Sequence, residues 1–170
     1  MKPSVEQQVA GRMAKIGAGL FFLWAVLHIW VGYEGVHQYL SSGTQGQWSM
    51  VIGGAKASRD AFQHSTDALT AYAHGQLLVN FCVDVGGYGV LGLVVGWLIW
   101  SRASWVGYFL GLFVIGIGDL AFLFSLVTSG VIEMNAGSVG GPIIWFLAIA
   151  ITPFGMPPLH AAQVLSLIHI

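Results

Sequence analysis

The order of apolar and polar positions divides the chain into four long hydrophobic stretches. They run from about Ile16 to Tyr33, from Gly75 to Trp100, from Trp105 to Val127 and from Pro142 to Met156. About 20 predominantly apolar residues are enough to cross the hydrocarbon core of a bilayer as a helix. We therefore predict an all-α polytopic membrane protein, a bundle of four transmembrane helices that forms one domain over residues 1–164.

A different pattern precedes the second stretch. From Ala57 to Ala73 the residues follow an amphipathic helical pattern that continues into the membrane helix. Its polar positions recur at helical spacing, and they are Asp60, His64, Asp67 and His74. The residues from Glu34 to Ser58 are rich in Gly, Ser and Gln, and we predict a loop there.

Composition agrees with a membrane protein. Of the 170 residues, 56% are hydrophobic and 8% are charged, and the mean hydropathy is +0.76. A soluble domain carries roughly 25% charged residues, so these charges are too few to cover a globular surface in water. The net charge of −1 gives no support for a nucleic-acid partner. The expected surroundings are therefore a lipid bilayer.

Polar residues inside the apolar stretches are the candidates for function. Gln76, Asn80 and Asp84 are spaced four residues apart, so they form one stripe on the second helix. A carboxylate in an apolar span is expensive and usually faces the interior of the bundle. We therefore predict that this stripe points into the bundle.

The other three helices each carry a polar or helix-breaking residue at a similar predicted depth. Counting along the helices at about 1.5 Å per residue brings His28, Asp119 and Thr152 to the level of Asp84. Pro153, next to Thr152, leaves the carbonyl one turn earlier without its helical donor. Two interpretations stay open: a buried binding or proton-relay site, or hydrogen bonds that only hold the helices together.

The amphipathic segment allows two interpretations as well. Carboxylate and imidazole ligands together suit zinc, iron or copper, which makes Asp60, His64, Asp67 and His74 candidate metal ligands. Their spacing is loose, and a solvated helix face explains the same residues. No cofactor follows from the sequence.

The glycines favour close helix packing. Gly92 and Gly96 in the second stretch, and Gly107 and Gly111 in the third, are spaced four residues apart. Small residues at this spacing let membrane helices approach one another. We predict that the two pairs face each other across the short turn at Arg102.

The run A-F-Q-H-S-T-D-A-L-T-A-Y-A-H-G-Q-L-L-V-N-F-C-V-D, together with the size and the four spans, resembles small bacterial inner-membrane proteins of the BphX-like family and, second, DoxX-like proteins. The resemblance covers roughly residues 16–160 and implies an accessory protein of a bacterial inner membrane.

The distribution of basic residues favours cytoplasmic termini, because more positive charge lies on the side of the termini than on the opposite side. The residues on the side of the termini are Lys2, Arg12, Lys15 and Arg102, and those on the opposite side are Lys56 and Arg59.

Three functions remain open on the sequence. The first is an accessory protein that binds a small apolar molecule or a membrane protein partner, including a second copy of itself. The second is a membrane oxidoreductase or metalloprotein that uses His28, His74 and the aspartates. The third is an oligomeric proton-coupled transporter.

The last residues, 165–170, resemble the translation of a transposon end sequence, and we predict that they are not native.

Overall fold

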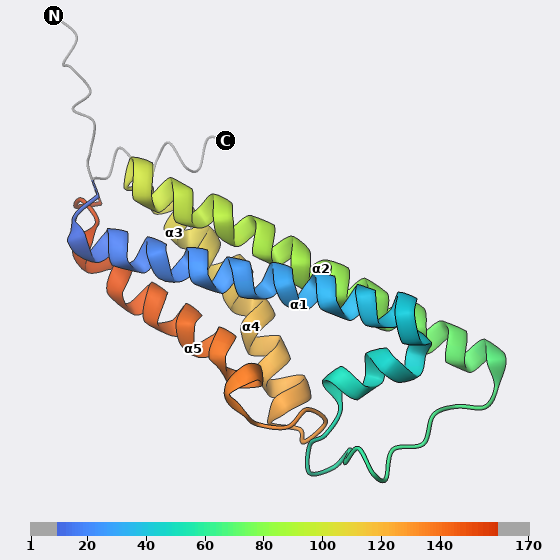
Figure 1. Cartoon of the computed structure of the whole chain (residues 1–170). Helices are drawn as coiled ribbons and strands as arrows, with labels where there is room; N and C mark the ends of the chain where they lie inside the picture. Colours follow the sequence, from blue (N-terminus) through green and yellow to red (C-terminus); the bar gives the residue numbers. More distant parts are fainter. Residues whose placement is uncertain (1–9, 160–170) are drawn as a thin grey trace, which may run out of the picture.

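The structure is a computed structural model that describes residues 10–159. Four helices in it are long and apolar enough to cross a membrane, and they pack side by side (Figure 1). The first two are α1 (Arg12–Val51) and α2 (Ala68–Arg102). The prediction of an all-α four-helix membrane bundle is confirmed. The predicted non-native tail, 165–170, lies outside the described residues.

The third and fourth membrane helices are less regular. The third begins as α3 (Trp105–Phe109), passes through π-helical turns at Leu110–Ile115, continues as α4 (Gly116–Phe122) and ends in further π-helical turns at Leu123–Val127. The fourth is α5 (Ala136–Ile151), followed by a 3-10 turn over Thr152–Gly155. We call the end of the bundle with the two long connections, 52–67 and 128–135, the loop end, and the opposite end the turn end.

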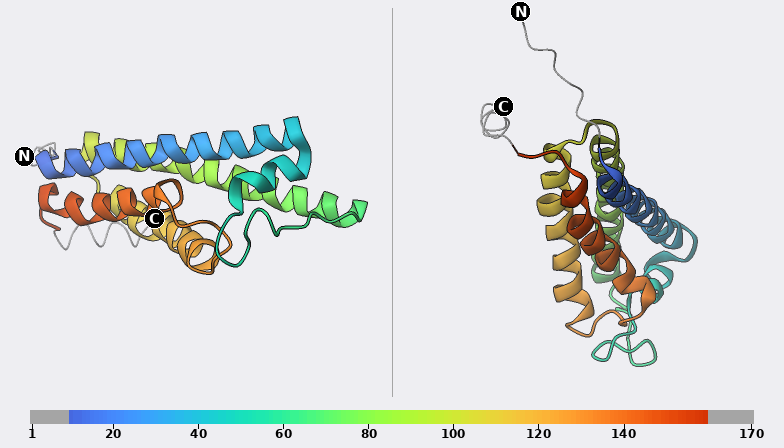
Figure 2. Two further views of the ribbon diagram at one scale, coloured as in Figure 1. Left: turned by 60° about the horizontal axis from the view of Figure 1, so that its bottom comes forward. Right: turned by 90° about the vertical axis from the view of Figure 1, so that its left-hand side faces the viewer.

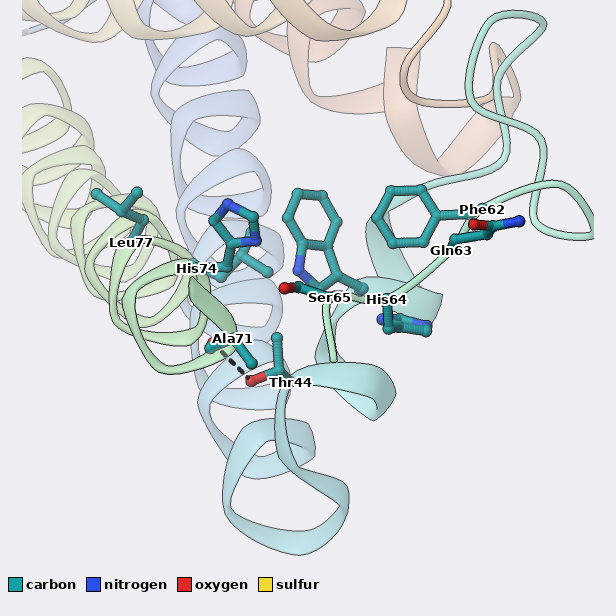
Figure 3. A pocket seen from close by; sticks show the side chains of 10 residues that line it. Thr44, Phe62, Gln63, His64, Ser65, Ala71, His74 and Leu77 are labelled. Carbon is teal, nitrogen blue, oxygen red and sulfur yellow. Dashed lines mark hydrogen bonds between the residues drawn. The ribbon is translucent and has the colours of Figure 1, made fainter. Parts of the chain in front are cut away.

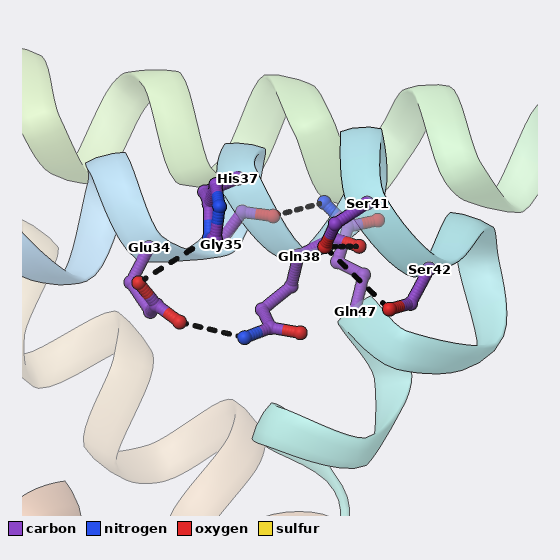
Figure 4. Close-up of polar contacts among 7 residues, drawn as sticks. All are labelled: Glu34, Gly35, His37, Gln38, Ser41, Ser42 and Gln47. Atoms are coloured by element: carbon purple, nitrogen blue, oxygen red, sulfur yellow. Dashed lines mark hydrogen bonds and ion pairs between the residues drawn. The ribbon is translucent and has the colours of Figure 1, made fainter.

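Helix α1 continues well beyond the predicted membrane span. We predicted a loop from Glu34 to Ser58, and this prediction is wrong for residues 34–51, because that polar stretch is helical. Glu34 accepts a hydrogen bond of 2.6 Å from Gln38, one turn later, and its other oxygen lies 3.7 Å from the His37 ring (Figure 4). Hydropathy alone does not detect such a helix, since these side chains stabilise it through polar pairs.

A glycine and a buried amide turn the end of α1 back toward the bundle. Gly43 has a φ of 63°, a left-handed conformation that glycine adopts without strain. Beyond it, Gln47 is 1% exposed and donates a hydrogen bond of 3.2 Å to the carbonyl of Gly35 (Figure 4). The Cys82 thiol of α2 lies against Gly35 at the same place. The folded-back part of α1 is therefore anchored to both helices.

The predicted amphipathic helix forms only in its second half. Helix α2 begins at Ala68, and the Asp67 carboxylate caps it by accepting a hydrogen bond of 2.7 Å from the backbone N–H of Thr70. Residues 57–67 are not regular helix, which corrects the prediction that the helix starts near Ala57. An N-cap aspartate satisfies backbone donors that a longer helix would otherwise satisfy itself.

The two long connections bind each other through their backbones. Four hydrogen bonds of 2.8–3.3 Å run from the N–H groups of residues 53, 54, 56 and 57 to the carbonyls of Gly130 and Val131. Gly130 has a φ of 82°, and a side chain at Gly54 would collide with the Gly130 carbonyl. We call these four bonds the loop pairing. It joins the α1–α2 pair to the α4–α5 pair at the loop end.

Glycines bring α1 and α2 into close contact. A Cβ added to Gly32 would lie 2.6 Å from the Cys82 carbonyl oxygen, so the two backbones nearly touch there. Gly92 and Gly96 pack against α1, with Trp24 and Phe22 as their neighbours, and not against the third helix as predicted. Helix α2 therefore turns its glycine face toward α1.

Candidate functional site

A cavity lies between the α1–α2 pair and the α4–α5 pair, toward the loop end. The pairs run apart in this direction (Figures 1 and 2), and the space between them has a volume of about 630 Å³. This size is typical of small-molecule sites, which fill roughly 300–1,000 Å³. Most of the lining is apolar, and it includes Leu27, Phe81, Val85, Ile115, Phe122 and Pro142. Residues of both connections, such as Ile52 and Ile132, line its outer part.

Three side chains form a polar centre on the wall of this cavity. The Trp24 indole N–H donates a hydrogen bond of 2.8 Å to Oδ2 of Asp119, which is only 4% exposed. The His28 ring stacks on Trp24 with 3.6 Å between ring centroids. Its Nε2 lies 3.5 Å from Oδ1 of Asp119. We call Trp24, His28 and Asp119 the midspan centre, because Trp24 lies about 12 Å along α1 from Ile16, near the middle of a ~30 Å core.

The hydrogen bonds of His28 fix where its protons are. Nδ1 lies 2.8 Å from the carbonyl oxygen of Trp24, which can only accept, so Nδ1 carries a proton. In a neutral ring Nε2 is then an acceptor, and it faces a carboxylate oxygen of Asp119, which is also an acceptor when ionised. The contact is favourable only with one further proton, on His28 or on Asp119. The pair can therefore take up one proton inside the bundle.

The predicted stripe on α2 does not point into the bundle as a whole. Asn80 donates a hydrogen bond of 2.9 Å to Asp84, and both side chains are exposed. Gln76 is exposed as well and donates one of 3.1 Å to the Tyr39 hydroxyl of α1. The prediction is wrong for Gln76 and Asn80, since α2 buries the face of Cys82, about 200° around the helix from Asn80.

Only the inner end of the stripe reaches the cavity. Asp84 lines it, although its carboxylate makes no hydrogen bond or ion pair with the midspan centre. Tyr88, one turn further along α2, packs its ring beside Gly118, where a Cβ would lie 3.7 Å away. Tyr88 lines the same cavity and contacts the residue that precedes Asp119.

Thr152 lies elsewhere. It is fully buried against Gly17, near the turn end, and its hydroxyl donates a hydrogen bond of 2.6 Å to the Ala148 carbonyl. The predicted common depth is wrong for Thr152, because α5 begins at Ala136, about six residues or ~9 Å before the expected start.

The acceptor expected from Pro153 exists. Proline has no N–H, so the Ile149 carbonyl lacks its helical donor, and the Tyr108 hydroxyl donates to it at 3.3 Å. Tyr108 therefore supplies the missing donor, and this acceptor belongs to the packing of the third and fourth helices.

Sequence reasoning missed Trp24, Arg59 and Glu133. Trp24 precedes His28 by one helical turn, and a buried indole N–H must find an acceptor. That requirement was the available signal. Arg59 and Glu133 line the outer part of the cavity from polar connections, where the sequence gives no register.

The candidate metal residues of the amphipathic segment do not form one cluster. His64 and His74 line a second pocket, of about 490 Å³, outside the bundle core (Figure 3). Two aromatic rings stand in its wall, Trp48 and Phe62, tilted toward each other with 5.2 Å between ring centroids. Within residues 10–159, no three His, Cys, Asp or Glu side chains gather closely enough to hold a metal ion.

The two aspartates of that segment take no part in the pocket. Asp67 caps α2, and the hydrogen bonds from the side chain and backbone of Thr70 lower its pKa. Asp60 is exposed. His28 of the midspan centre and His74 of the second pocket lie in separate cavities.

Comparisons with protein-family models, with curated proteins and with solved structures find no match for this chain. The resemblance to BphX-like and DoxX-like proteins stays a prediction.

Proposed function

We propose that this protein binds a small, mostly apolar molecule in the cavity between α1, α2, α4 and α5, with the midspan centre as its polar anchor. The observation that carries the proposal is the position of His28 and Asp119 on the wall of a cavity of about 630 Å³. Ligand sites typically combine an apolar lining with a few convergent polar groups.

The state of the polar groups supports binding over a purely structural role. Polar side chains with a purely structural role form their hydrogen bonds within the protein, as Asn80 and Asp84 do on α2. His28 Nε2 and Asp119 Oδ1 instead stay 3.5 Å apart beside open space, where a ligand atom can reach both. An ionisable group buried in a membrane helix and facing a cavity commonly marks function.

A small apolar photoreagent tests the proposal. An aryl diazirine dissolves in the bilayer, and its photolysis product attaches to the residues that it touches. We expect label on lipid-facing residues such as Phe113, which is 59% exposed, and also on His28, which faces the cavity. The label is located by mass spectrometry of peptides.

Two glycine variants make the test specific. Gly118→Phe places a ring beside Tyr88 in the cavity and should remove the label from His28. Gly87→Phe adds the same ring where no atom lies within 4 Å, so it should leave the label on His28 unchanged. Label on Phe113 without label on His28 in the wild type would refute an accessible cavity.

A further inference from the structure

We propose that the ligand of the cavity is a lipophilic cation, and that it exchanges with the proton held by His28 and Asp119. This inference rests on the proposed function, because it assigns the chemical class of molecule to the same cavity.

The charges that line the cavity favour a cation. Three carboxylates face it, from Asp84 on α2, Asp119 on α4 and Glu133 in the second connection, against the single guanidinium of Arg59. Arg59 stands at the loop end, where its Nε donates a hydrogen bond of 2.9 Å to the Ile52 carbonyl. Helix α5 contributes no charged side chain to the lining, and Tyr88 is the remaining titratable group. The deep part of the cavity therefore has no permanent positive charge.

Asp119 needs a positive partner at this depth. A carboxylate in the middle of a membrane is costly unless it is paired, and the cost falls when it is neutralised. Trp24 gives it one hydrogen bond from an uncharged donor. His28 is the only side chain within ion-pair distance of Asp119 in the described part of the chain, and it is charged only when it carries a second proton. Either a proton or a bound cation can supply the missing charge.

The aromatic lining suits an organic cation with a large apolar body. Trp24 binds Asp119, Tyr88 lies beside Gly118, and Trp30 lines the same cavity. Aromatic faces attract cations, most strongly where water is excluded. The apolar remainder of the lining contacts the body of such a molecule, while a small hydrated ion would gain nothing from it.

The exchange conserves charge. In the empty protein the pair holds one proton, either as imidazolium with carboxylate or as neutral imidazole with carboxylic acid. When the cation binds to the Asp119 carboxylate, the proton leaves for water through the outer part of the cavity, past Asp84 and Glu133. His28 is then neutral, with Nδ1–H still donated to the Trp24 carbonyl. One positive charge enters and one leaves, and no bond other than the one to the proton is broken.

Tetraphenylphosphonium is the appropriate probe, because it is apolar, permanently charged and carries no titratable proton. Any proton released on binding must then come from the protein. Calorimetric titration of the whole protein in lipid nanodiscs, in two buffers of different ionisation heat, counts released protons. We expect about one proton released per cation bound, and an affinity that rises with pH because proton release accompanies binding.

Matched carboxylate variants assign the proton. Asp119→Asn should weaken binding at least about tenfold and abolish both proton release and pH dependence. Glu34→Gln removes a carboxylate outside the cavity and should change neither. If the Asp119 variant does not fold, the proton count and the pH slope of the wild type still decide.

The outcomes separate the two proposals. Binding of tetraphenylphosphonium without proton release, or with an affinity independent of pH, overturns the exchange. If tetraphenylphosphonium does not bind although the aryl diazirine labels His28, the proposal of a cationic ligand is refuted, while the proposal of a binding cavity is retained. If neither reagent reaches His28, both proposals fail.

Discussion

The contact between α1 and α2 at Gly32 makes a quantitative prediction about stability. A Cβ on Gly32 would lie 2.6 Å from the Cys82 carbonyl oxygen and 2.8 Å from both N and Cα of Gly86. These are backbone atoms, so no side chain can rotate away. The carbonyl would have to retreat to about 3.4 Å, where ordinary contacts begin. Gly32→Ala should therefore force the two helices apart.

The expected cost follows from two opposing effects. Overpacking of this kind costs about 1–3 kcal/mol, while replacing a helical glycine by alanine gains up to about 1 kcal/mol in helix propensity. Gly19→Ala is the matched control, because Gly19 is an exposed α1 glycine with nothing within 4 Å of an added Cβ. Gly19→Ala gains the helix propensity of alanine without the steric clash, so the free energies of unfolding of the two variants should differ by about 1–3 kcal/mol.

Reversible unfolding in mixed micelles, titrated with sodium dodecyl sulfate, measures this difference. Both variants carry the same chemical change on the same helix, which cancels effects on the unfolded chain. If Gly32→Ala is as stable as Gly19→Ala, the helices are not in backbone contact at Gly32, and the packing described here is refuted.

Two further predictions concern groups near the loop end. The pKa of Asp67 is lowered from its ordinary value of 3.8 by hydrogen bonds from Thr70, so its stabilisation of α2 is complete above that value and is lost as the pH falls through the lower folded value. Hydrogen exchange in the first turn of α2, corrected for intrinsic rates, should rise on acidification below about pH 4, whereas Asp67→Asn, an uncharged cap, should remove the pH dependence. Gln47→Met should leave thermal stability within about 1 kcal/mol of wild type, because it removes the 3.2 Å bond to Gly35 but also an Oε1 that has no partner within residues 10–159; a larger loss in detergent would contradict this balance.

The sequence was sufficient for the membrane helices because their signal is strong and local. Apolar stretches of membrane length are recognised without any knowledge of their neighbours. The ends of the helices were less predictable. Helix α1 continues over polar residues to Val51, and α5 starts at Ala136 because Asn135 and Ser138 form a capping box there. Pro142 suggested that the fourth helix begins there, but the capping box at Asn135 starts the helix earlier and leaves Pro142 inside it.

The candidate site was predictable only in part, because the depth of a residue in the membrane and the direction in which its side chain points are separate properties. Counting residues brought His28 and Asp119 to one level, and the structure places their side chains 3.5 Å apart. The direction of Asn80 depends on which face of α2 packs against α1, and glycines decide that face. Their contacts come from the partner helix, which a sequence pattern of a single span does not contain. Trp24 joined the centre for the same reason, through an acceptor on another helix.

The loop pairing has a consequence for the order of assembly. Its donors follow α1, whereas its acceptors, the carbonyls of Gly130 and Val131, come after the third membrane helix. Synthesis proceeds from the N-terminus, so these hydrogen bonds cannot form until three helices have been made and inserted. Until then the space beside α1 and α2 is open at the loop end. Its closure is a late event in biogenesis, and it depends on backbone groups that most side-chain substitutions leave intact.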